Sequence, residues 1–254
     1  TYTSIEEMAE SGEIDAVYIA SPNSLHAEQA ILCMERGIPV LCEKPLASNT
    51  REVEAMIGTA KKHNVLLMEA LKTTFIPSFR VIQEHLPKIG TIRRYSSSFC
   101  QYSSRYDAYK EGTILNAFNP KFSNGSLMDI GIYCLYPMLA LFGEPERLQA
   151  SGTMLETGVD GQGTISFKYD TMEAVIQYSK ITDSHAPTEI QGENGNIVID
   201  KISSPSDVRI IYRDGRTEDL SVPQHENTMY YEAEEFIHLL KSGEKESSIN
   251  TFDL

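Results

Sequence analysis

The residues best suited to chemistry form a charged pair at the end of an apolar run. Residues 38–42 are Ile-Pro-Val-Leu-Cys, and Glu43, Lys44 and Pro45 follow at once. Such a run is typical of a buried strand, and parallel strands present their carboxyl ends to the ligand crevice of an α/β fold. A lysine there is costly to desolvate without a partner, and Pro45 restricts its backbone. Taken alone, the three residues fit a salt-bridged strand end and a functional site about equally well.

A second chemical pair lies in an apolar segment near the middle of the chain. Residues 125–143 are apolar on nearly every face, which predicts a buried helix. Asp129 and Tyr133 are four positions apart in this segment, so their side chains share one helix face. A buried carboxylate needs a partner. The pair is therefore either an Asp–Tyr hydrogen bond within the core or a catalytic pair.

The elements around Lys44 alternate between strands and helices. Strands are predicted at 16–20, 40–42 and 65–68. Helices are predicted at 24–36, with Ser24 as the cap, and from a cap at residue 48 or 49 to residue 60. Strands and helices that alternate in this way form βαβ units with a parallel sheet and right-handed crossovers.

The rest of the chain is predicted to be rich in strands. A long strand at 90–102 precedes the apolar helix, and further strands are expected at 148–155, 163–168, 172–178, 188–192, 195–200 and 208–212, before a final helix at 230–240. Short consecutive strands with alternating polarity favour an antiparallel, meander-like open sheet packed on helices such as 126–142. The predicted fold class is thus α/β plus α+β. Residues 1–72 form part of a Rossmann-like parallel sheet, and residues 73–254 form an open, mainly antiparallel sheet domain.

Composition narrows the possible functions. Lys and Arg number 22 against 36 Asp and Glu, a net charge of −14, which disfavours nucleic-acid binding. The four cysteines show no Cys-x-x-Cys pairing and the histidines show no metal-ligand spacing, so free thiols and no metal are expected. No uninterrupted apolar run has the roughly 18 residues of a membrane span, and no signal peptide is recognised. A cytoplasmic protein is the expectation, with neither nucleic acid nor membrane as a partner.

Two ordered motifs resemble a known family. The first motif consists, in order, of Ser21-Pro22-Asn23, His26, a helix, Gly37, a strand and Glu43-Lys44-Pro45. It is similar to a motif of the Gfo/Idh/MocA family of NAD(P)-dependent oxidoreductases. The segment from Asp129 to Tyr133, Asp-Ile-Gly-Ile-Tyr, resembles the family's second motif, Asp-x-Gly-x-His or Asp-x-Gly-x-Tyr. The tyrosine form is similar to the dihydrodiol dehydrogenase and glucose–fructose oxidoreductase branch.

The resemblance implies a dehydrogenase that uses NAD or NADP. Hydride would move between the cofactor and a hydroxyl or carbonyl carbon of a sugar, polyol or cyclic diol. Lys44 would hydrogen-bond the reacting oxygen, and Tyr133 would be the acid/base, its ordinary pKa of about 10 lowered by that ammonium. Asp129 would orient Lys44 or Tyr133, or bind substrate hydroxyls.

The resemblance also implies a cofactor side of the site. The residues expected to line it are Ser21, Pro22, Asn23, His26, Glu43 and Lys44. Glu43 would lie near the nicotinamide or pair structurally. In the family the open sheet often forms an oligomer interface, so a homodimer or higher homo-oligomer through the C-terminal sheet is expected.

One expected feature is absent from this sequence. No Gly-x-Gly-x-x-Gly turn is present, so residues 1–72 resemble only the second half of a dinucleotide-binding domain. This polypeptide by itself is therefore expected to bind dinucleotide poorly, and the acidic residue that would distinguish NAD from NADP is not in it.

Two other functions use the same fold. A non-catalytic sensor of NAD(P) or sugar would not need Lys44, Asp129 and Tyr133 together. A glycoside hydrolase that uses bound nicotinamide transiently would release product with no net NADH signal. Fold alone does not decide between these functions and a dehydrogenase.

Overall fold

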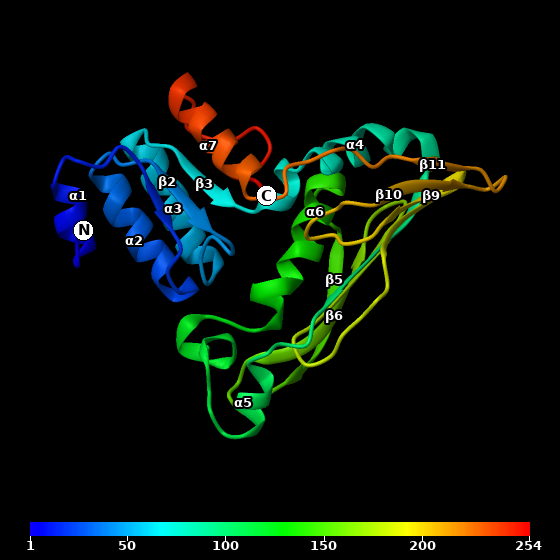
Figure 1. Cartoon of the computed structure of the whole chain (residues 1–254), viewed down its shortest axis with the longest axis horizontal. Coiled ribbons are helices and arrows are strands. Elements are labelled where there is room, and N and C mark those ends of the chain that lie inside the picture. Colours follow the sequence, from blue (N-terminus) through cyan, green and yellow to red (C-terminus); the bar gives the residue numbers. More distant parts are fainter. The chain divides into compact units, whose positions relative to one another are not determined.

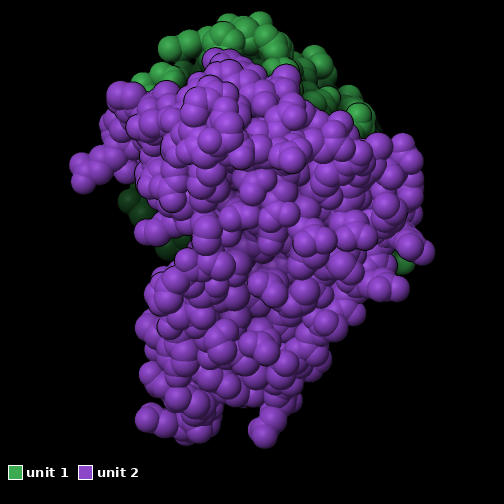
Figure 2. Space-filling model, turned by 90° about the vertical axis from the view of Figure 1, so that its right-hand side faces the viewer, with its two compact units in different colours: residues 1–71, 121–123, 229–253 green, residues 72–120, 124–228, 254 purple.

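The computed structural model describes all residues, 1–254, and its contacts divide the chain into two compact units. Unit 1 contains residues 1–71, 121–123 and 229–253, and unit 2 contains residues 72–120, 124–228 and 254 (Figure 2). The C-terminal segment joins unit 1 through contacts such as that of Asn250 Nδ2, which donates to the Glu69 carbonyl at 3.3 Å. The division into domains at residues 72 and 73 remains an interpretation of the sequence.

Unit 1 is built on a three-stranded parallel sheet. Its strands are β1 (Val17–Ile19), β2 (Val40–Glu43) and β3 (Leu67–Ala70), in that order across the sheet. The helices of the unit are α1 (Ile5–Glu10), α2 (Asn23–Glu35), α3 (Thr50–His63) and α7 (Tyr230–Ser242) (Figure 1). Apolar residues of the strands and of α2 and α3 form one core, which includes Val40, Cys42, Leu67, Met34 and Met56. The predicted βαβ arrangement is therefore present.

The helix ends in unit 1 follow local sequence signals, with one exception. The Ser4 side chain caps α1 by accepting from the Glu7 N–H at 3.3 Å, and Asn49 caps α3 by accepting from the Glu52 N–H at 3.1 Å. The predicted cap at Ser24 is wrong, because α2 already begins at Asn23 after Pro22 and no side chain caps it. The fixed φ of proline, −59° here, suits the entry to a helix.

Unit 2 contains an eight-stranded sheet. Its strands are β4 (Ile92–Cys100), β5 (Arg147–Met154), β6 (Asp160–Lys168), β7 (Glu173–Ser179), β8 (Thr188–Gly192), β9 (Gly195–Ile199), β10 (Val208–Tyr212) and β11 (Thr217–Asp219). Their order is β11-β10-β9-β8-β4-β7-β6-β5. The expected simple meander is wrong at one position, because β4 lies between β8 and β7 and pairs with β7 in parallel. All other neighbours are antiparallel, as predicted.

The helices of unit 2 are α4 (Pro77–His85), α5 (Tyr106–Lys110) and α6 (Ile132–Phe142), and a π-helical turn at Leu127–Gly131 leads into α6. Helix α6 packs on β4 and β7, and no helix covers the opposite face of the sheet (Figure 1). The segment 105–124 contains α5 and two short 3₁₀ turns, at Asn116–Phe118 and Pro120–Phe122. It is held by an aromatic cluster of Tyr106, Tyr109 and Phe118.

The segment Pro120–Phe142 is long and apolar enough to pass a length-and-hydropathy test for a membrane span. Three of its residues, Ile130, Cys134 and Met138, instead belong to the core beneath the eight-stranded sheet. Core helices pass the same test, so this segment is accounted for by the packing of unit 2.

Candidate active site

In unit 1, the polar residues of interest lie where the three strands end. The pairing of Ile19 with Cys42 and of Cys42 with Glu69 places the three carboxyl ends level with one another. The loop that begins at Ser21 follows β1, and Lys44 follows β2. This edge is where open α/β sheets bind their ligands.

His26 joins the loops that follow β1 and β2. It is 1% exposed, with Nδ1 3.0 Å from the Pro45 carbonyl oxygen and Nε2 2.9 Å from the Ser21 carbonyl oxygen. Both ring nitrogens are therefore engaged with the backbone. The geometry gives His26 a positioning role, and the predicted contact of its side chain with the cofactor remains a prediction.

Other side chains fix the first loop. Ser21 Oγ donates to Gln29 Oε1 at 2.7 Å, and Asn23 Nδ2 donates to the Ser123 carbonyl at 3.1 Å. These bonds hold the loop against α2 and against residues 121–123, which belong to the same unit.

Glu43 has structural partners in unit 1. The Tyr18 hydroxyl donates to Glu43 Oε1 from the neighbouring strand, and Glu43 Oε2 accepts from the Lys44 N–H at 3.2 Å. Desolvation, followed by the bond to Glu43, raises the pKa of Tyr18. Of the two roles expected for Glu43, these contacts support the structural pairing.

Glu69, at the end of β3, is a further ionisable group beside Lys44. Its Oε1 accepts from the Leu46 N–H at 2.7 Å, which ties β3 to the turn after Pro45. Desolvation raises the pKa of the Glu69 carboxyl to about 7, while the Leu46 hydrogen bond and the Lys44 charge act in the opposite direction. The sequence analysis gave Glu69 no role.

This edge fits the nicotinamide-ribose side of a dinucleotide. The first turn of α2 has no side-chain cap, so its backbone N–H groups can meet the acceptor oxygens of a ligand. The loops after β1 and β2 carry the hydroxyl of Ser21 and the ammonium of Lys44, and the first residue of α2 carries the amide of Asn23. No group of three or more His, Cys, Asp or Glu side chains is arranged to hold a metal ion.

In unit 2, Asp129 and Tyr133 lie on the π-helical turn and the start of α6. Gly131 between them is required by packing, because a Cβ there would lie 2.9 Å from the ring Cγ of Tyr178 on β7. The Tyr133 ring packs edge-on against Phe99 of β4, with centroids 5.9 Å apart. The Asp-x-Gly-x-Tyr spacing thus lets this segment lie directly on the sheet.

Asp160 holds the start of the same segment. Its Oδ1 accepts from the Ser126 N–H at 3.1 Å and its Oδ2 accepts from the Leu127 N–H at 2.7 Å. Gly125 has a φ of +154°, and a Cβ there would lie 2.1 Å from Asp160 Oδ1. Asp160 therefore acts as an N-terminal cap and requires a glycine next to it.

Asp129 is paired with a residue that the sequence analysis did not identify. Lys180, immediately after β7, donates from Nζ to Asp129 Oδ2, with its side chain 10% exposed and that of Asp129 34% exposed. Lys180 and Asp129 are 51 residues apart, so no local pattern in the sequence predicted the pair. The burial of Lys180 does follow the alternation of buried residues at Ile176 and Tyr178. Lys44 belongs to unit 1, and the Asp129–Lys180 pair belongs to unit 2.

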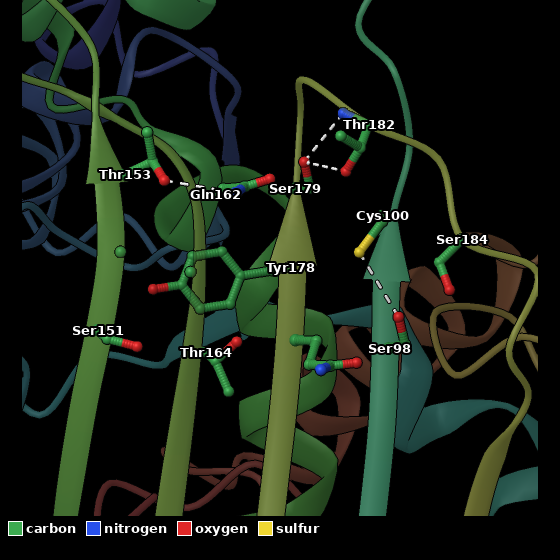
Figure 3. Close-up of a pocket in the computed structure, with 13 residues that line it drawn as sticks. Ser98, Cys100, Ser151, Thr153, Gln162, Thr164, Tyr178, Ser179, Thr182 and Ser184 are labelled. Atoms are coloured by element: carbon green, nitrogen blue, oxygen red, sulfur yellow. Dashed lines mark hydrogen bonds between the residues drawn. The ribbon is translucent and has the colours of Figure 1, made fainter.

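The uncovered face of the large sheet is a separate polar surface. Ser151, Thr164, Gln177 and Ser98 are direct neighbours on successive strands β5, β6, β7 and β4. They line a hollow of about 410 Å³ together with Cys100, Thr153, Gln162 and Ser179, which form a second such row (Figure 3). None of the predicted catalytic residues lines this hollow.

Two family models match the chain. Residues 1–71 match the NAD-binding Rossmann fold of the oxidoreductase family Gfo/Idh/MocA, and residues 85–198 match the Gfo/Idh/MocA C-terminal domain. Together they cover more than half of the chain.

Two curated relatives that the chain resembles are named as dehydrogenases. The chain is 58% identical over 252 residues to scyllo-inositol 2-dehydrogenase (NADP(+)) IolU of Bacillus subtilis (strain 168), covering 99% of this chain and 77% of that protein. It is 31% identical over 262 residues to trans-1,2-dihydrobenzene-1,2-diol dehydrogenase of Xenopus tropicalis, covering 98% and 76%.

Solved structures agree with the fold. An aldose-aldose oxidoreductase from Caulobacter crescentus superposes with a TM-score of 0.84 at 22% identity, covering 99% of this chain and 76% of that one. KijD10, a 3-ketoreductase from Actinomadura kijaniata in complex with NADP and TDP-benzene, gives a TM-score of 0.82 at 24% identity, covering 97% and 76%.

These matches confirm the predicted fold class and the predicted enzyme class. The protein is an NAD(P)-dependent oxidoreductase that acts on the hydroxyl or carbonyl carbon of a sugar, polyol or cyclic diol. The chain belongs to the Gfo/Idh/MocA family of oxidoreductases.

Proposed function

We propose that the protein oxidises a ring hydroxyl of an inositol or a similar cyclic polyol with NADP. The 58% identity to a scyllo-inositol 2-dehydrogenase (NADP(+)) supports this substrate class and this cofactor. The observation that carries the site is the ordered Asp129–Tyr133 segment, which holds a carboxylate and a phenol on one turn above the sheet. Residues 1–72 would bind the cofactor, and residues 73–254 would bind the substrate and a second copy of the chain.

Three side chains carry the proposed chemistry. A bound nicotinamide supplies the hydride acceptor or donor. The Lys44 ammonium hydrogen-bonds the substrate oxygen and favours negative charge on it. Tyr133 accepts the proton of the reacting hydroxyl as the phenolate, a form that the Lys44 charge favours, and returns the proton as the phenol in the reverse reaction. Asp129 accepts hydrogen bonds from neighbouring substrate hydroxyls or orients Tyr133.

The cofactor side of the proposed site is the edge of the small parallel sheet. The backbone around Ser21, Pro22 and Asn23 and the first turn of α2 would meet the ribose. His26 would hold this loop to the Pro45 turn, as its two carbonyl contacts support. Glu43 would keep the end of β2 in place through Tyr18.

The test is steady-state absorbance at the NADPH band with the full-length protein. Scyllo-inositol, myo-inositol, glucose and a cyclic diol are compared with NADP and with NAD. Lys44→Ala and Tyr133→Phe are each expected to lower turnover by a factor of about 10² to 10⁴, the usual contribution of general acid–base catalysis. Lys62→Ala, on the exposed part of α3, is the control with unchanged turnover.

Wild-type turnover in folded Lys44→Ala and Tyr133→Phe would contradict the assigned roles. Cofactor binding without any net signal, but with cleavage of a glycoside, would instead support the hydrolase.

We infer that the uncovered face of the large sheet pairs with a second copy of the chain. A net charge of −14 opposes the association of two copies, and the two rows that line the hollow add no charge to it, because they carry only Ser, Thr, Gln and Cys side chains. Gln177→Arg, at the centre, is expected to convert a dimer into a monomer in sedimentation experiments. A monomeric wild type would contradict the interface.

A cytoplasmic location also remains a proposal. All four cysteines are free thiols, as proteins of a reducing compartment usually keep them. Fractionation of cells with an antibody to the protein tests this location, and recovery outside the cytoplasm would contradict it.

A further inference from the structure

Lys180 is a buried charge to which the mechanism above gives no role. Its side chain is 10% exposed, and its ammonium donates to Asp129 Oδ2. A lysine withdrawn from water is costly unless a charge partner is fixed against it. By contrast, Lys88 and Glu218 in the same unit form a pair at 2.5 Å with side chains 43% and 36% exposed.

The backbone around Lys180 is held on both sides. The Lys180 N–H donates to the Gly161 carbonyl at 2.9 Å, and its carbonyl accepts from the Ser103 N–H at 2.9 Å. Just before it, Ser179 Oγ accepts from the N–H groups of Ile181 and Thr182 at 3.1 and 3.0 Å, which turns the chain at the end of β7. The position from which the ammonium projects is therefore fixed.

The carboxylate is fixed from the same strand. Tyr178, two residues before Lys180, packs against Gly131 and so supports the turn that carries Asp129. Asp160 caps the first turn of that segment from β6. Neighbouring strands thus hold both the backbone and the charge of Asp129.

We propose that Lys180 is a positioning residue, whose ammonium fixes the Asp129 carboxylate as a charged acceptor for a substrate hydroxyl beside Tyr133. This role rests on the proposed function, because it requires Asp129 and Tyr133 in the active site.

The test compares Lys180→Met, Lys180→Arg and Asp129→Asn with the double variant Asp129→Asn/Lys180→Met in the full-length enzyme. Lys180→Met is expected to raise the KM for the polyol about ten-fold or more and leave the KM for the dinucleotide unchanged. Lys180→Arg keeps the charge, so its polyol KM is expected to lie within about three-fold of the wild-type value. In the Asp129→Asn background, Lys180→Met should raise the polyol KM by a further factor of less than about two, because the two residues act as one unit.

Lys88→Met is the matched control, since it removes a lysine from an exposed ion pair of the same unit and is expected to leave all kinetic constants unchanged. If Lys180→Met does not fold by circular dichroism, Lys180→Gln replaces it, because glutamine keeps a hydrogen-bond donor without the charge.

Two results would overturn the role of Lys180 and leave the proposed function standing. One is a wild-type polyol KM in Lys180→Met or Lys180→Gln. The other is an effect of Lys180→Met on the polyol KM that is as large in the Asp129→Asn background as in the wild type. Absence of turnover by the wild type with every polyol would refute the proposed function and this role with it.

Discussion

The Glu69→Gln variant is expected to gain stability relative to the wild type as the pH rises. Desolvation raises the pKa of the Glu69 carboxyl from 4.5 to about 7 in the folded chain. The unfolded chain then loses this proton near pH 4.5 and the folded chain only near pH 7. Between these values the unfolded state binds fewer protons, so the wild type loses stability as the pH rises.

The magnitude follows from the two pKa values. Their difference, at about 1.4 kcal/mol per pH unit, gives about 3.5 kcal/mol as an upper limit. Most of this loss falls between pH 5 and pH 8. Glutamine does not ionise, and its side-chain oxygen can still accept from the Leu46 N–H, so the bond that holds the Pro45 turn is kept.

The assay is urea unfolding followed by circular dichroism at pH 5, 6, 7 and 8. The free energy of unfolding of Glu69→Gln minus that of the wild type should rise by about 2–3 kcal/mol from pH 5 to pH 8. The control is Glu54→Gln on the exposed part of α3, for which the difference should stay constant. Parallel pH dependence of Glu69→Gln and the wild type would show that the carboxyl ionises normally and refute the reasoning.

Three further predictions concern unit 2. Gly131→Ala should destabilise the protein by about 1–3 kcal/mol, because its Cβ would lie 2.9 Å from the Tyr178 ring; urea unfolding measures this, and an unchanged midpoint would contradict the packing. Asp160→Ala should cost about 1–2 kcal/mol through the loss of two backbone N–H partners, whereas unfolding that matches the wild type would mean that the cap contributes nothing. Burial raises the pKa of Cys134 to about 12, so iodoacetamide at pH 8 should label Cys100 and spare Cys134 in the native protein. Mass spectrometry measures the labelling of each cysteine, and equal labelling of the two would refute this prediction.

Local features of the fold were predictable from the sequence. The alternation of apolar strands with amphipathic helices predicted the parallel sheet of unit 1, and the cap at Ser4 follows from residues within one turn. The two motifs that contain Lys44 and Asp129 identified the family without any structure, because residue type and short spacing carry that signal.

The sequence did not predict the hydrogen-bond and ion-pair partners of two candidate site residues. Asp129 needed a buried partner, and the sequence predicted one on the same helix or in Lys44. The structure supplies Lys180 from another element, 51 positions away. Similarly, His26 was expected at the cofactor, while its two nitrogens face the backbone of Ser21 and Pro45.

The sequence by itself determined most of the helices and strands, though not α5 or β11, and the family to which the chain belongs, because hydrophobic period and motif spacing are local properties. Only the tertiary structure decided that β4 lies between β7 and β8, that Lys180 faces Asp129, and that Glu69 lies where desolvation raises its pKa. The physical reason is that strand neighbours, ion-pair partners and desolvation depend on contacts between residues far apart in the chain. No local pattern encodes those contacts.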